Sequence, residues 1–221
     1  DGLNIPFVMT TTDSKLRGKF YDLRVKSDYK EAKKIAESNI HKVFHNAASD
    51  ITALSNIGIN IPMDDMTKID DTMAQANIVN ENFESKKLKR LAGTYLNDPC
   101  LEEKELKKSI SEVKKELVWP GKWTKGDDLP YDMIPTDVLR KYAGKAPWYT
   151  VKLDKLFSKE INRYRDVYQL ELDIIPVIVD MQRNGMRIDR GFGKRMFDSY
   201  SAEMVECEKS MRKYLRKHDI I

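Results

Sequence analysis

The chain has 221 residues, of which 41% are hydrophobic and 33% charged, and its formal net charge is +4 at pH 7. This length suits one large domain, or one domain and part of a second. Aromatic residues make up 9% of the chain and provide core material, which excludes an intrinsically disordered protein. No apolar run approaches the roughly 18 residues of a membrane-spanning helix, so we expect no membrane partner. The mild positive charge permits a nucleic-acid partner but excludes histone-like electrostatics.

The cysteines and the start of the chain bear on its cellular context. Cys100 and Cys207 lie far apart and outside any metal-binding spacing. They predict reduced thiols of an intracellular protein, in the cytoplasm or nucleoid, with a viral or organellar origin left open. The chain begins at Asp1 with neither an initiator Met nor a signal peptide. We therefore expect a fragment or a processed product.

The first forty residues predict two strands and a helix. Residues 7–11 are apolar and β-branched, and residues 20–25 alternate between apolar and polar side chains. Both patterns favour strands, and the polar stretch between them favours a turn. Ser27 and Asp28 come directly before a helical apolar face, so we expect them to cap a helix.

A second strand and helix follow directly. Residues 42–45 form a short apolar segment that runs into a helical pattern from Asn46, and Gly58 ends that pattern. Strand, helix, strand and helix in quick succession indicate an α/β unit with parallel strands.

Helices dominate from Thr67 onward. Ser85 predicts a helix cap, and Pro147 interrupts a later helical pattern. Residues 119–130 contain Pro, Gly and Asp and predict a loop. The expected helices lie at residues 85–96, around the apolar stripe of 106–117, at 136–145 and at 153–161.

The character of the sequence changes near Arg163. Residues 170–181 are strongly apolar and contain Pro176, which predicts a kinked helix. Residues 186–189 favour a short extended segment. The remaining residues predict a long amphipathic helix that needs a partner helix, with an apolar stripe of Met196, Tyr200, Met204, Cys207, Met211 and Tyr214.

The most informative stretch is His45-Asn46-Ala47-Ala48-Ser49-Asp50, where a strand passes into a helix. Open α/β sheets bind their ligands at such junctions. By itself the pattern is weak, because an Asp near a helix start is more often a structural cap. The three histidines His41, His45 and His218 share no metal-ligand spacing, so we assign none of them a catalytic role.

Further motifs follow in a defined order: Asp71-Thr72-Met73-Ala74, the segment 85–96, Tyr142-Ala143-Gly144-Lys145-Ala146, the segment 170–177, and the segment 184–189. With the His45–Asp50 stretch, they resemble the proofreading exonuclease domain and the beginning of the thumb in family A DNA polymerases, the bacterial polymerase I type. The resemblance covers nearly the whole chain. It implies an α/β, ribonuclease H-like 3′–5′ exonuclease domain at residues 1–162 and a helical thumb segment at residues 163–221.

The resemblance also implies a chemistry. Family members hydrolyse the terminal nucleotide of a single-stranded 3′ end with two divalent ions held by four carboxylates, and hard oxygen ligands suit Mg²⁺ or Mn²⁺. It implies that Asp50 is a metal ligand, that Tyr142 orients the attacking water, and that position 146 carries a second metal-binding Asp. It further places Asn46 and the basic residues Lys86, Lys87 and Arg90 at the substrate.

This sequence departs from the family pattern at three places. Position 146 is Ala, whose methyl group cannot bind a metal, and Ser49 stands where the family usually has an aromatic residue. The family's Asp-x-Glu pair would fall upstream of Asp1, on a first strand that this chain lacks. We therefore predict that the chain as given has no exonuclease activity. An engineered Asp-to-Ala change is the preferred explanation of Ala146. The alternative is a naturally inactive DNA-binding or structural module of a non-proofreading polymerase.

The expected partners are DNA and the remaining polymerase palm and fingers, which would follow Ile221. A stand-alone exonuclease has no use for residues 170–189, which argues against that rival. Lys86, Lys87, Lys89 and Arg90 fit phosphate contacts, although a solvated helix face is the default explanation. Residues 119–123 suit either a base-stacking platform or a self-packed loop, the latter being favoured. Five basic residues near the end fit either the primer–template duplex or a solubilising face: Lys209, Arg212, Lys213, Arg216 and Lys217.

Overall fold

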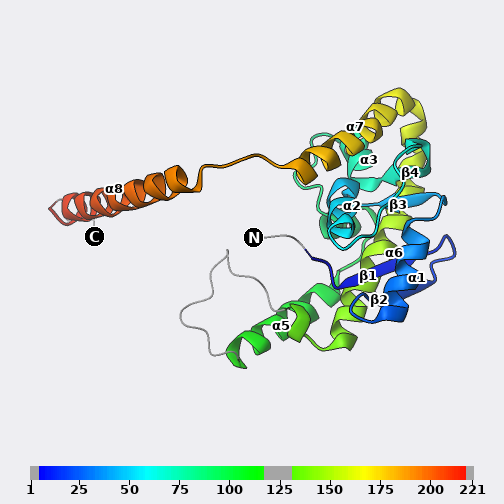
Figure 1. Cartoon of the computed structure of the whole chain (residues 1–221), viewed down its shortest axis with the longest axis horizontal. Coiled ribbons are helices and arrows are strands. Elements are labelled where there is room, and N and C mark those ends of the chain that lie inside the picture. Colours follow the sequence, from blue (N-terminus) through cyan, green and yellow to red (C-terminus); the bar gives the residue numbers. More distant parts are fainter. Residues whose placement is uncertain (1–4, 117–130, 218–221) are drawn as a thin grey trace. The chain divides into compact units, whose positions relative to one another are not determined.

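The computed structural model describes residues 5–116 and 131–217 (Figure 1). The chain divides into two compact units, Asp1–Arg183 and Asn184–Ile221. Residues 119–123, for which the sequence suggests a role, and His218, which receives none, lie outside the described residues.

The first unit begins with an antiparallel hairpin of β1 (Val8–Thr12) and β2 (Gly18–Asp22), in which Val8 faces Asp22 and Thr12 faces Gly18. Asp13 fixes the turn, because its carboxylate accepts hydrogen bonds from the backbone N–H groups of Lys15 and Arg17, both at 2.9 Å. Both predicted strands are confirmed, although the second ends at Asp22 rather than at residue 25.

Helix α1 (Lys26–Ala36) follows, and the predicted cap is wrong. Its N-cap residue is Val25, whose side chain cannot cap a helix. The Asp28 carboxylate instead accepts a hydrogen bond from the Asp22 N–H at 3.1 Å, which ties the first turn of α1 to the end of β2.

A parallel strand pair forms the centre of the unit. β3 (Lys42–Phe44) pairs with β4 (Ile69–Asp71), and Phe44 faces Asp71 at their carboxyl ends. Helix α2 (Ala47–Ser55) leaves β3, and helix α3 (Thr72–Val79) leaves β4 after a short 3-10 turn, η1 (Met66–Lys68). The mixed α/β class is confirmed, but the expected parallel pairing of the second strand with the strand at residues 42–45 is wrong, because β2 pairs antiparallel with β1 and β3 pairs with β4 instead. The sequence analysis missed β4, since three residues with two aspartates show no strand pattern.

The next helices are α4 (Leu88–Tyr95) and α5 (Leu101–Glu116), followed by η2 (Tyr131–Met133). Helix α4 begins three residues later than the predicted cap. Its N-cap residue is Lys87, and the Ser85 hydroxyl lies 3.5 Å from the Lys87 nitrogen.

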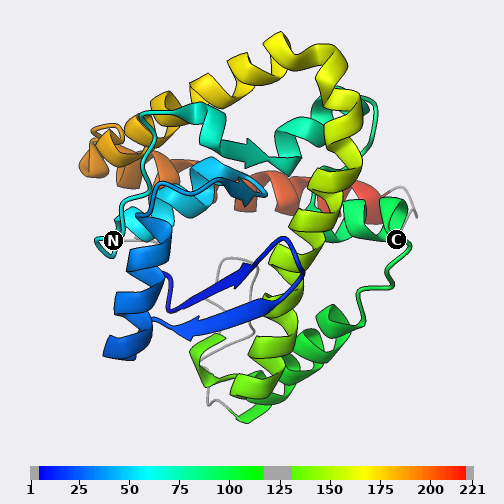
Figure 2. The same cartoon turned by 90° about the vertical axis from the view of Figure 1, so that its right-hand side faces the viewer.

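The predicted break at Pro147 is also wrong, because α6 (Thr136–Ile161) runs straight through it. A proline has no N–H, so the Ala143 carbonyl one turn earlier loses its helical partner. The Thr10 hydroxyl donates to that carbonyl at 2.9 Å. The hairpin thus supplies the missing hydrogen bond, and Figure 2 shows the blue hairpin lying across the yellow-green helix.

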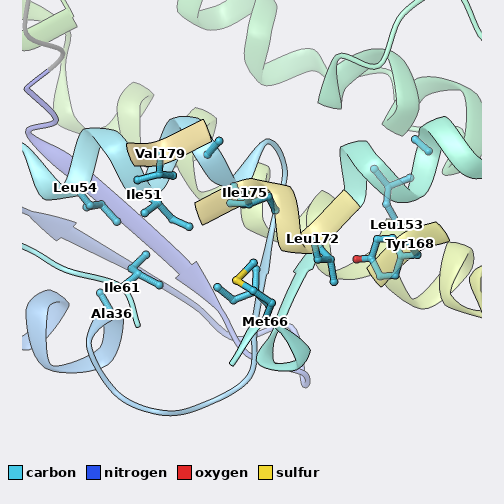
Figure 3. Close-up of a cluster of buried hydrophobic side chains, with 14 of the residues drawn as sticks. Ala36, Ile51, Leu54, Ile61, Met66, Leu153, Tyr168, Leu172, Ile175 and Val179 are labelled. Atoms are coloured by element: carbon cyan, nitrogen blue, oxygen red, sulfur yellow. The ribbon is translucent and has the colours of Figure 1, made fainter. Parts of the chain in front are cut away.

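The unit ends with η3 (Asn162–Tyr164) and α7 (Arg165–Asn184). Helix α7 also continues through its proline, Pro176. Its apolar face packs into the main hydrophobic core, where Tyr168, Leu172, Ile175 and Val179 meet side chains of α2 (Figure 3). The helix that the sequence analysis assigned to the thumb therefore belongs to the same compact unit as the strands. The assignment of residues 163–221 to a thumb stays a prediction.

The second unit contains the predicted long helix, α8 (Arg190–Lys217). The Asp189 carboxylate accepts from the Phe192 N–H at 2.9 Å and caps its start. Tyr200, Met204 and Met211 of the predicted stripe are exposed. Two of the basic residues near its end form ion pairs on the helix itself, Arg212 with Glu208 at 2.7 Å and Lys209 with Glu206 at 3.9 Å.

Candidate functional site

Asp71 organises the carboxyl ends of the two parallel strands. Its buried carboxylate accepts three backbone hydrogen bonds, from Asn46 at 3.0 Å, Ala47 at 2.6 Å and Met73 at 2.8 Å. Two of these N–H groups belong to the start of α2, where Asn46 adopts a left-handed conformation with φ of 71°. One carboxylate thus caps α3 and also fixes the sharp turn from β3 into α2.

Asp50 lies in the first turn of α2, on the helix that Asp71 positions. The residue is exposed, yet desolvation by the protein atoms around its carboxyl raises the pKa to about 6, and the nearby Asp71 carboxylate adds to the rise. The carboxylate of Asp50 makes no hydrogen bond or ion pair with another described residue. It is thus available to a ligand.

His45 occupies a structural position at the end of β3. The Thr72 hydroxyl donates to the Phe44 carbonyl at 3.1 Å, so it must accept from the His45 ring, whose Nδ1 lies 2.9 Å away. Desolvation lowers the pKa of His45, and the Asp71 charge opposes that shift only in part. The hydrogen bond with Thr72 thus ties the end of β3 to the start of α3.

A cleft of about 850 Å³ opens between α4, α5 and α6. Tyr142 and Ala146 line it from α6, and Lys87 and Arg90 line it from the start of α4. The other charged residues of its lining are Lys89, Asp98, Glu103, Lys104 and Lys107. Cations therefore outnumber carboxylates in the lining, which favours an anionic ligand.

A network of buried polar contacts connects the three helices that line the cleft. Lys89 forms an ion pair with the buried Glu102, and its ammonium lies 4.8 Å from the centre of the Tyr142 ring and 4.6 Å from that of Tyr149. The Tyr149 hydroxyl lies 2.8 Å from Asp98 Oδ1 and 3.1 Å from Glu102 Oε1. These contacts join α4, α5 and α6 around the Tyr142 side chain.

Two groups in this region have shifted pKa values. Partial burial raises the pKa of Tyr142, and neighbouring Tyr131 and Glu103 act in the same direction, so its phenol stays protonated at neutral pH. Desolvation alone would raise the pKa of Asp98, but hydrogen bonds from the Cys100 N–H, Tyr149 and a lysine outweigh it and lower the pKa.

The structure brings together four of the predicted site residues: Tyr142, Ala146, Lys87 and Arg90 all line the cleft. The lining does not include Asp50, Asn46 or Lys86. Asn46 contributes its backbone to the Asp71 cap. The Lys86 ammonium lies 2.6 Å from the Asn80 carbonyl and 3.0 Å from that of Phe83, so it holds its own loop together.

The metal implied by the resemblance does not fit the described residues. Among them, no three His, Cys, Asp or Glu side chains come together in a way that could hold a metal ion. The acidic neighbour of Asp50 is Asp71, whose carboxylate already accepts three backbone hydrogen bonds, and Ala146 has no oxygen to offer. The two-ion site therefore has no support in this part of the chain.

Sequence reasoning missed three contributors to this region. Asp71 was quoted as part of a motif without a role, although an Asp directly before Thr72 is a recognisable cap signal. Glu102 and Tyr149 gave no signal, because their partners Lys89 and Asp98 lie 13 and 51 residues away along the chain.

The described residues thus form a mixed α/β domain with a capped strand–helix junction and a cleft in which cations outnumber carboxylates. The 3′–5′ exonuclease family matches residues 20–162, and the chain belongs to it, as the exonuclease domain of a family A DNA polymerase. This confirms the exonuclease part of the resemblance read from the motifs, and the match ends at residue 162. No helix in the described part of the chain is both long and apolar enough to span a bilayer.

Two phage proteins are similar to the chain. The DNA polymerase of Escherichia phage T5 is 28% identical over 156 residues, which are 68% of this chain and 17% of that protein. DNA polymerase DpoZ of Salmonella phage PMBT28 is 25% identical over 179 residues, which are 77% of this chain and 26% of that protein. The chain thus spans about a quarter of the length of these relatives or less.

Proposed function

We propose that the cleft binds the single-stranded 3′ end of DNA, and that the parent protein is a DNA-directed DNA polymerase. The excess of cations in the lining carries this proposal. Lys87 and Arg90 stand at the start of α4, across the cleft from Tyr142 of α6. Phosphodiester groups are the anions that such side chains bind, without regard to base sequence.

Within this proposal Tyr142 is the polar group at the reacting end. Its raised pKa keeps the phenol neutral, so it can donate one hydrogen bond to a phosphate or sugar oxygen while accepting another from water. The adjacent Lys89 ammonium fixes the ring from one face and brings positive charge close to the bound strand.

We further propose that this chain does not hydrolyse the strand it binds. The family chemistry needs several carboxylates for Mg²⁺ or Mn²⁺, whereas no three potential ligands come together among the described residues and position 146 carries a methyl group. The chain would then act as a DNA-holding module. This is the role that the naturally inactive alternative also assigns to it.

Fluorescence anisotropy with a labelled 12-nucleotide single strand in EDTA tests the binding. Lys87→Ala combined with Arg90→Ala should weaken binding about tenfold and lower the salt slope by about 1.4, since each phosphate contact on a single strand contributes about 0.7. The matched control removes two exposed lysines of α1, Lys30 and Lys34, and should change the affinity less than twofold. Equal losses in both double variants would contradict a specific cleft.

A nuclease assay tests the second part. With Mg²⁺ or Mn²⁺ present, the chain should release no nucleotides from a 3′-labelled single strand. Release that disappears in Asp50→Asn would show an active site and overturn the proposed inactivity, while the binding proposal would stand.

For residues 163–221 we propose the start of a polymerase thumb, followed in the parent by palm and fingers. Its support is the helical character of α7 and α8 and the greater length of the related polymerases. Lys213→Ala with Arg216→Ala should then weaken binding of a primer–template duplex more than binding of a single strand. An unchanged duplex affinity would argue against this assignment.

A further inference from the structure

Helix α5 forms a second wall of the cleft, opposite α4. We call Glu103, Lys104 and Lys107 the α5 wall; all three line the cleft. The sequence analysis gave this helix only an apolar stripe, and neither the motifs nor the family resemblance assigns these residues a role.

The charges of the cleft do not cancel. Lys107 pairs with Glu103 at 2.5 Å, Lys89 pairs with Glu102, and Asp98 pairs with Lys145 at 3.2 Å. The lining cations left over are Lys87, Arg90 and Lys104, which have no acidic partner among the described residues. Positive charge therefore faces the cleft from both helices. Glu103 is ionised, because its hydrogen bond with Lys107 lowers its pKa, and its single negative charge is balanced by Lys107, so the three remaining cations leave an excess of positive charge.

The buried network holds the α5 wall in place. Glu102, in the first turn of α5, lies 3.1 Å from the Tyr149 hydroxyl of α6 and pairs with Lys89 of α4. Glu103 and Lys104 follow it directly along the same turn. The first turn of the helix is therefore fixed by contacts with two neighbouring helices before any ligand binds, and a surface fixed in this way loses little conformational entropy on binding.

We propose that the α5 wall binds the phosphate backbone of a single strand beyond its 3′-terminal nucleotides, without a metal ion. This inference rests on the proposed function, because it extends the same cleft. A strand whose end lies at Tyr142 meets α4 on one side and the α5 wall on the other, so its phosphates have cations on both sides. Lys104 contributes an unpaired charge, and the Lys107 ammonium, which has three N–H donors, can also donate to a phosphate while it stays paired with Glu103.

An anisotropy experiment with DNA strands of two lengths distinguishes binding at the α5 wall from binding at the α4 side of the cleft. Lys104→Ala combined with Lys107→Ala should weaken binding of a 12-nucleotide strand about tenfold and lower its salt slope by about 1.4. The same variant should bind a labelled dinucleotide as the unmodified chain does, because a dinucleotide does not reach the wall. The control is Lys30→Ala with Lys34→Ala, which removes the same charge from α1, and circular dichroism checks that all variants are folded.

The outcomes distinguish this inference from the proposed function. If the chain binds the 12-nucleotide strand and the α5 variant binds it equally well, the inference is overturned while the proposed function stands. If the unmodified chain binds no single strand, both fall. If poly-glutamate of equal charge displaces the strand as well as unlabelled DNA does, the cleft is a general polyanion site and the inference is wrong. Loss confined to the long strand supports it.

Discussion

Replacing Asp71 by Asn should expose how much one carboxylate contributes to the strand–helix junction. Asn has the same shape but only one acceptor oxygen, so its amide group would face at least one of the three backbone N–H groups. A buried donor left without a partner costs about 1–3 kcal/mol, and the remaining bonds lose their charge assistance. Together these effects predict a loss of about 3 kcal/mol in the free energy of unfolding.

Urea unfolding followed by far-ultraviolet circular dichroism measures this loss. In a thermal scan the same change should lower the melting temperature by roughly 6–12 °C, since 1 kcal/mol corresponds to about 2–4 °C in a domain of this size. The control is Asp65→Asn, which changes an exposed cap that accepts from the Thr67 N–H at 3.2 Å. A loss for Asp71→Asn no larger than that of the control would refute the role given to this carboxylate.

Three further changes test other contacts. Thr10→Val leaves the Ala143 carbonyl without a donor and should cost about 1–2 kcal/mol in urea unfolding, whereas Thr11→Val should cost much less. Tyr168→Phe removes the acceptor of a buried backbone N–H and should cost about 2 kcal/mol; an unchanged midpoint would contradict that contact. The pKa of Asp50, about 6, exceeds its ordinary value of 3.8, so the folded state of the unmodified chain loses stability as the pH rises from about 4 to 6. Asp50→Asn should therefore be more stable at pH 7 by about 1 kcal/mol after allowance for solvent exposure, with no difference at pH 3.5; equal stability at pH 7 would refute this.

Local sequence patterns were enough for part of the fold. The hairpin follows from two β-branched segments around Asp13, and the passage from β3 into α2 follows from an apolar strand ended by a helical pattern up to Gly58. Such features depend on neighbours within a few residues. The long helices were predicted for the same reason, since their apolar stripes repeat at helical spacing.

The remaining features depend on contacts between distant segments. Strand β4 is three residues long, and the N–H of Asp71 is satisfied by the Tyr168 hydroxyl, 97 residues along the chain. Helix α6 passes through Pro147, where Thr10 replaces the lost hydrogen bond. Neither contact can be predicted from the neighbouring residues in the sequence. Helix propensity alone therefore predicts a break at Pro147, where α6 continues.

In the candidate site, too, local patterns located some residues, whereas contacts between distant segments placed the others. Position 146 and Tyr142 were located by their motif, and the cleft contains both of them. The α5 wall was not predicted, because its place depends on Glu102 reaching Tyr149 and Lys89 on other helices. The role of Asp50 as a metal ligand stays a prediction, and the carboxylate of its neighbour Asp71 is engaged by three backbone N–H groups.

The contact between Thr10 and the Ala143 carbonyl has a consequence for the order in which the protein can mature. The two residues are 133 positions apart, so on the ribosome the hairpin emerges long before the helix that it completes. The hairpin cannot make this contact until α6 has been synthesised. Helix α6 in turn retains an unsatisfied Ala143 carbonyl, one turn before Pro147, until the hairpin docks. The region around Tyr142 therefore reaches its final form late, and native-state hydrogen exchange should find the hairpin and the middle of α6 opening together as one unit.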